Sequence, residues 1–200
     1  MKKNFFIIVS FILIILSLSN KSFAYSDDPK EFITEIVNEA KKALTETNSI
    51  EFKTKKLSEI ALDTVDIRGV GLYTLGNYRK SLNDEQIKEY FELFEKYFLK
   101  SFTSRLTDYS DPKIEVLTSE KLNEKYTIVK SVLLATDKKP QVKIDWRVYT
   151  KDPNNLLIRD FIVEGLSLAR TQKEEFASVI ESNDGDVTKL FLTLREFIAK

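Results

Sequence analysis

The first half of the chain carries apolar residues at the three- and four-residue spacing of amphipathic helices, from Pro29 to Leu106. Asp28-Pro29 supplies a capping side chain and a first-turn proline, which favours a helix start there. Asn48-Ser49 can cap a second helix. A third, short helix is predicted from Gly69 to Tyr78, weakened by the glycines it contains. The pattern therefore predicts a run of helices with few breaks between them.

The strongest helical pattern follows Asn83-Asp84, which can cap a helix. Its apolar stripe is almost entirely aromatic and consists of Ile87, Tyr90, Phe91, Phe94, Tyr97, Phe98 and Phe102. Such a stripe is typical of a helix that faces an ordinary core. The alternative is that the ring faces line a cavity. This helix alone leaves both interpretations open.

From Lys113 the period of apolar positions changes to two, which predicts strands. Turn residues at 122–124, 138–140 and 152–155 divide this region into about four strands, which form an antiparallel meander. The strand positions are Ile114 and Val116, then Tyr126, Ile128, Val132 and Leu134, then Val142, Ile144, Trp146 and Val148, and then 157–163.

After Gly165 the helical period returns, with Ser167 as a cap, and a last helix follows the turn at 183–186. Helices, then a sheet, then helices is the order of an α+β fold. We expect N-terminal and C-terminal helices to cover one face of a curved antiparallel sheet of about four strands.

The N-terminus reads as a secretory signal peptide. Lys2 and Lys3 precede an apolar run of about 14 residues that ends at Leu18, shorter than the roughly 20 that span a bilayer. Ser22-Phe23-Ala24 fits a cleavage site, so we expect a signal peptide over 1–24 and one exported domain over 25–200. An uncleaved anchor is the alternative.

The composition narrows the chemistry, because the chain contains no cysteine and no histidine. Disulfides, histidine-dependent nucleophile systems and ordinary zinc sites are therefore excluded. The few glycines are scattered and form no phosphate-binding loop, so no cofactor is expected. The predicted signal peptide holds three of the 31 basic residues and none of the 31 acidic ones, so the exported chain is slightly acidic, which weighs against nucleic acid as a partner.

Paired carboxylates are among the catalytic options that remain, alongside Lys, Tyr and Ser. The candidate pairs are Asp108 with Asp111, Asp184 with Asp186, and Asp145 with Asp160. The first two pairs lie in turns, where acids usually cap or are solvated. Asp160 lies among apolar strand neighbours, and Arg147 or Arg159 is expected to neutralise it in a structural role.

Two stretches of the chain resemble the MlaC family, also called the toluene-tolerance family. The first comprises Val65-Asp66, Leu75-Gly76-Asn77-Tyr78-Arg79, Phe91, Phe94 and Phe102-Thr103-Ser104-Arg105-Leu106. The second comprises Asp145-Trp146-Arg147-Val148, 160–168 and 171–176. They occur in one order with family-like spacing over most of the exported chain.

The resemblance implies an NTF2-like fold with an apolar cavity between the sheet and its helices. It also implies a periplasmic phospholipid carrier that is not an enzyme. Such a carrier binds a glycerophospholipid by its tails and shuttles it between an outer-membrane lipoprotein-porin complex and an inner-membrane ABC transporter with an MCE-type ring, which maintains outer-membrane lipid asymmetry.

Three alternatives to the phospholipid carrier remain. One is a carrier of hopanoid or another polycyclic lipid, and the second is an envelope adaptor without cargo. The third is a small exported enzyme that uses an Asp or Tyr in the cavity.

The candidate lipid-binding residues come from the aromatic helix and from the sheet: Phe91, Phe94, Phe98, Val132, Ile144, Trp146, Val148, Phe161 and Val163. Ordinary core packing is the alternative role for about half of them. Arg68, Arg79 and Lys173 are candidates to meet a lipid phosphate or a partner surface, with simple solvation as the alternative.

Overall fold

The computed structural model describes residues 25–109, 111–137 and 139–200. The predicted signal peptide and its cleavage site after Ala24 lie outside the described residues. The helices are α2 (Pro29–Thr45), α3 (Ile50–Thr64), α4 (Ile67–Leu75), the 3₁₀ helix η1 (Gly76–Lys80), α5 (Asp84–Thr107), α6 (Leu168–Glu181) and α7 (Val187–Ala199). The strands are β1 (Ile114–Asn123), β2 (Tyr126–Leu133), β3 (Val142–Tyr149), β4 (Leu157–Val163) and β5 (Leu166–Ser167).

The sheet is an antiparallel meander in the order β1-β2-β3-β4-β5, which confirms the predicted α+β class. The short strand β5 is an addition to the predicted four. It forms because Glu164 and Gly165, both with positive φ (49° and 82°), make a two-residue hairpin turn after β4. From the sequence, Gly165 predicts only a break before the next helix.

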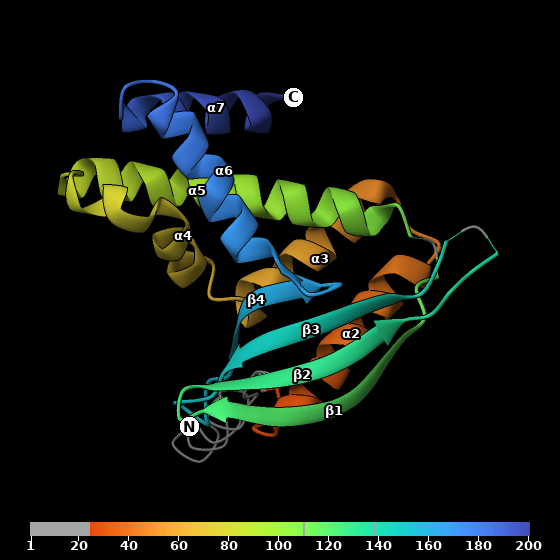
Figure 1. The fold of residues 1–200 in the computed structure, drawn as a ribbon. Coiled ribbons are helices and arrows are strands. Elements are labelled where there is room, and N and C mark those ends of the chain that lie inside the picture. The colour runs from red at the N-terminus through yellow and green to blue at the C-terminus, as the bar shows by residue number, and fades with distance from the viewer. Residues whose placement is uncertain (1–24, 110, 138) are drawn as a thin grey trace, which may run out of the picture.

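In Figure 1, α2 and α3 lie behind the sheet, α5 runs across above it, and α6 crosses in front of α5. The last helix, α7, packs against α5 and α6. The buried apolar residues form one cluster that joins the inner face of β2, β3 and β4 to all of these helices. The core therefore lies between the sheet and its helical cover.

The predicted caps are present at the helix starts. Asp28 accepts the backbone N–H groups of Lys30 and Glu31, and Ser167 accepts that of Arg170. Asn83 forms a capping box with Gln86, in which each side chain accepts the other residue's backbone N–H. These side chains satisfy donors that no helical carbonyl can reach.

The third helix differs from its predicted range of 69–78. Asp66 accepts the N–H of Gly69 and so caps α4 earlier, at Ile67. The helix ends at Leu75, because Gly76, with a φ of 56°, breaks the α-helical path and begins η1. At Gly71, inside the helix, any larger residue would place its Cβ within 2.9 Å of the Phe94 ring. The glycine thus permits the close approach of α4 and α5.

Tyr90 anchors this contact with a fully buried hydroxyl. Its Oη lies 2.8 Å from Thr74 Oγ1 and donates to the carbonyl of Gly71 at 3.1 Å. Its ring stacks on Phe94 at 5.7 Å and contacts Phe191 of α7 at 6.1 Å between centroids. One side chain therefore joins α4, α5 and α7, and its burial raises the pKa of the phenol well above the usual value.

Tyr90→Phe is expected to lower the free energy of unfolding by about 1 kcal/mol at neutral pH, because it removes a buried hydrogen bond. Above about pH 10, the ordinary tyrosine pKa, Tyr90 ionises in the unfolded chain but keeps its proton when folded. The free energy of unfolding of the wild type therefore falls as the pH rises through this range. The variant has no phenol at this position and shows no such fall. Denaturant melts should show the difference vanish near about pH 11; a constant difference up to that pH would contradict the assignment.

Candidate functional site

An apolar cavity of about 390 Å³ lies between the inner face of the sheet and helices α2, α3, α5 and α6. Its apolar wall includes Ile36, Val37 and Ala40 of α2, Leu57, Ile60 and Ala61 of α3, Phe94, Phe98, Phe102 and Leu106 of α5, Val142, Ile144 and Trp146 of β3, and Ile158, Phe161 and Val163 of β4. The volume lies within the roughly 300–1,000 Å³ typical of ligand cavities.

A continuous run of aromatic rings connects the helical wall to the sheet. Phe94 contacts Phe98 at 6.3 Å, and Phe98 stacks on Phe102 at 5.7 Å with the ring planes 10° apart. Phe102 then contacts Phe161 at 5.8 Å, and Phe161 contacts Trp146 at 5.1 Å. Phe98, Phe102 and Phe161 are only partly buried, so the run presents apolar surface to the cavity.

Several polar groups of the sheet are paired within the protein. The Trp146 Nε1–H donates to Ser131 Oγ at 2.8 Å, and the Ser131 hydroxyl donates to the carbonyl of Ile144 at 2.8 Å. Asp160, which is 4% exposed, accepts from the Ser167 hydroxyl at 2.6 Å and from the Ala169 N–H at 3.0 Å. Arg147 lies 3.5 Å from the same carboxylate and is its cationic partner, one of the two predicted.

One group of polar side chains on the cavity wall lies between α5 and α6. Tyr97 donates to Gln172 Oε1 at 2.6 Å, and the Gln172 amide donates to Glu175 at 3.0 Å. Burial, and then the negative charge of Glu175, raises the pKa of Tyr97. The exposed Arg105 also lines this part of the wall. These side chains form a polar seam between α5 and α6.

Six of the nine predicted site residues line the cavity together: Phe94, Phe98, Ile144, Trp146, Phe161 and Val163. They come from α5, β3 and β4, so the predicted meeting of the aromatic helix with the sheet is observed. Phe94 and Trp146 are almost fully buried and also belong to the core, whereas the other four are half-buried.

The other three predicted residues lie outside the cavity wall. Phe91 faces α4, where the Arg68 guanidinium covers its ring at 4.0 Å. Val148 is fully buried at the far end of β3, opposite Ile158. Val132 pairs with Lys143 and Glu115, so it lies on the sheet face opposite the cavity.

The placement of Val132 corrects the predicted phase of β2. The inner face of this strand consists of Thr127, Val129, Ser131 and Leu133, whose partners on β3 include Ile144 and Trp146. Two hydroxyl residues stand at these inward positions, so the apolar alternation pointed to the wrong face. The Ser131 hydroxyl is tolerated there because Trp146 and Ile144 satisfy it.

Sequence reasoning also missed several wall residues. Phe102 continues the four-residue spacing of Phe94 and Phe98, so the helical period contained that signal. The contributions of α2 and α3, such as Ile36 and Ile60, look like any core-facing stripe and carry no such signal. Tyr97 and Gln172 are far apart in sequence, and only the packing of α6 on α5 brings them together.

Within residues 25–109, 111–137 and 139–200, no helix is both long and apolar enough to cross a membrane. The same residues contain no cluster of three or more acidic side chains arranged to hold a metal ion. Asp186 of the candidate pair Asp184 and Asp186 instead caps α7 by accepting the N–H of Thr188.

A curved sheet and helices that enclose an apolar cavity define a protein built to bind an apolar molecule. The chain belongs to the MlaC family, because the family model described as MlaC protein matches residues 30–196. A solved structure with a similar fold is a phospholipid-binding protein from Ralstonia solanacearum in complex with a phospholipid. The likeness has a TM-score of 0.73 at 20% sequence identity and covers 86% of this chain and 97% of that chain.

Proposed function

We propose that the protein binds a glycerophospholipid, with its acyl chains in the apolar cavity and its headgroup in water. The cavity is the observation that carries this proposal: it is walled by aliphatic and aromatic side chains and is continuous from α5 to β3. The phospholipid bound by the similar Ralstonia protein supports the same class of ligand.

The energetics explain why a carrier needs such a wall and little chemistry. At about 0.8 kcal/mol per buried methylene, two tails of roughly 16 carbons represent on the order of 25 kcal/mol of transfer free energy. A lone lipid therefore does not cross an aqueous compartment unshielded. The half-buried lining residues Phe98, Ile144 and Val163 provide apolar contacts for tails without closing the cavity.

The polar seam between α5 and α6 is the proposed position of the headgroup. Arg105 supplies a cation for a lipid phosphate, and Gln172 and Tyr97 line the wall beside it. A charged headgroup placed against the apolar side chains of the wall would lose its hydration, at a large cost in free energy.

The carrier role extends this binding function. In the proposal the protein is periplasmic, exported by its N-terminal signal peptide, and shuttles lipid between an outer-membrane lipoprotein-porin complex and an inner-membrane ABC transporter with an MCE-type ring. Membership of the MlaC family supports this role. Binding and release, rather than a reaction, is what the apolar cavity serves.

Native mass spectrometry of the protein purified from the periplasm, followed by solvent extraction, tests the proposal. The expected result is about one phospholipid per chain, released only on denaturation. If the extract contains a hopanoid and no phospholipid, the cargo is a hopanoid. An empty, well-folded protein would contradict the proposal and favour an adaptor without cargo.

A further inference from the structure

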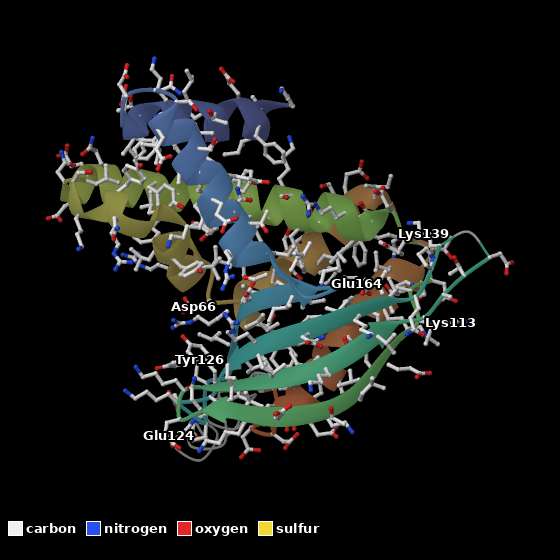
Figure 2. The ribbon with its side chains drawn as sticks, in the orientation of Figure 1. Asp66, Lys113, Glu124, Tyr126, Lys139 and Glu164 are labelled. Atoms are coloured by element: carbon white, nitrogen blue, oxygen red, sulfur yellow. The ribbon has the colours of Figure 1, made fainter. Side chains whose placement is uncertain are left out.

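A second concave surface lies beside the apolar cavity, at α4 and η1. It is an open groove of about 410 Å³, lined by Asp66, Arg68, Leu72, Tyr73, Arg79 and Arg159, and is called the basic groove below. Figure 2 shows Asp66 beneath α4, at the end of the molecule away from Lys113 and Lys139. Arg159 also lines the apolar cavity, so the two sites adjoin at this residue, whereas Arg68, Tyr73 and Arg79 line the groove alone.

The charges in the basic groove do not cancel. Its single acid, Asp66, is already engaged by Arg159 at 2.5 Å and by the Gly69 N–H at 2.8 Å. Arg68 and Arg79 are exposed, and neither forms an ion pair with any described residue. Lys173 adds a further positive charge beside the groove, with its Nζ 5.3 Å from the Tyr73 ring centroid.

The two exposed arginines are held in place by contacts that leave charge available. The Arg68 guanidinium lies over the Phe91 ring at 4.0 Å, and Arg79 Nη1 donates to the Leu72 carbonyl at 3.4 Å. A guanidinium that is held through its face or one nitrogen keeps other N–H groups free for a carboxylate. This also explains why Phe91 faces α4 instead of the cavity.

We propose that the basic groove docks an acidic segment of a protein partner, whose carboxylates pair with Arg68 and Arg79. The inference deepens the proposed function, because a carrier that shuttles lipid must dock on the proteins that load and unload it. Arginine and tyrosine are the residue types enriched where proteins bind one another, and Tyr73 is exposed at the groove.

The charge distribution favours a protein segment over a membrane surface as the occupant. The whole chain has a formal net charge of +0, so it has no general attraction to anionic lipid. The guanidinium groups of Arg68 and Arg79, which pair with no described acid, line a concave site, which fits a projecting side chain better than a flat bilayer. Binding to bilayers relies instead on clusters of several basic residues spread along a surface.

A titration of ¹⁵N-labelled exported protein with a capped hexaglutamate peptide, followed by NMR, tests the inference. The expected result is saturable shifts of the amides of Gly69, Leu72 and Tyr73, with affinity falling as salt is raised. Arg68→Gln with Arg79→Gln is expected to weaken binding roughly tenfold. The control variant is Lys113→Gln with Lys189→Gln. It removes the same charge at two positions that do not line the groove, one just before β1 and one on α7, and is expected to leave affinity unchanged.

Equal weakening by the two double variants would overturn the inference, since net charge alone would then explain binding. Binding to phosphatidylglycerol vesicles that depends on Arg68 and Arg79, without peptide-induced shifts, would also overturn it in favour of a membrane. Lipid content is measured on the same samples. Protein that carries lipid but does not bind the peptide contradicts only the docking proposal. Lipid-free protein that binds the peptide in the groove contradicts only the proposal of phospholipid binding.

Discussion

Ile144→Glu is expected to reduce co-purified phospholipid at least about tenfold while the protein stays folded. Ile144 lies on the inner face of β3 and lines the cavity, where it is half-buried. A carboxylate there would lose its hydration against the acyl chains without gaining an ion pair, a cost of several kcal/mol. Each 1.4 kcal/mol corresponds to about a tenfold change in affinity. Solvent extraction with lipid quantification per chain measures the effect.

The neighbouring Lys143 provides the matched control. Lys143→Gln changes the net charge by the same amount as Ile144→Glu but lies on the outer face, opposite Val132. It is expected to keep its lipid. Ile144→Trp fills the cavity without adding a charge, and so tests the wall even if the glutamate variant fails to fold. A folded Ile144→Glu protein with normal lipid content would show that the tails bind elsewhere.

The fold was predictable where local signals and the final packing agree. The caps at Asp28, Asn83 and Ser167 were readable because a short polar side chain before an apolar periodic run has one common use. The change of the apolar period to two after residue 113 predicted the sheet, because alternation is typical of strands with one buried face. The α+β class follows from the order of these signals.

The site was predictable only in part, because the sequence does not distinguish a cavity wall from a core. Phe94, Phe98 and Phe102 lie on one helical face, but their exposure to the cavity depends on how far α5 stands from the sheet. The inner face of β2 was assigned to the wrong phase because Thr127 and Ser131 face inward as paired hydroxyls. The basic groove was foreshadowed by Arg68 and Arg79, but only the turn at Gly76 brings both residues to one surface.

Asp160→Ala is expected to lower the free energy of unfolding by about 2–4 kcal/mol, because three groups lose their acceptor or counter-charge. These are the Ser167 hydroxyl, the Ala169 N–H at the start of α6 and the guanidinium of Arg147. Because Arg147 is 37% exposed, water replaces part of its ion pair and the range is kept below that of a fully buried pair. For a domain of this size, the melting temperature should fall by about 5–15 °C.

Asp145→Ala is the matched control for this prediction. Asp145 is a half-buried aspartate on the adjacent strand β3, paired in register with Ile162, and its carboxylate forms no hydrogen bond or ion pair with the described part of the chain. Its loss is expected to change stability by less than about 0.5 kcal/mol. Ser167→Ala should cost about 1 kcal/mol, as loss of a helix cap does. The double variant Asp160→Ala with Ser167→Ala should cost less than the sum of the single changes, because both remove one network. If Asp160→Ala melts as Asp145→Ala does, the carboxylate does not hold α6 to the sheet, and the cavity wall at this helix must be positioned by apolar packing alone.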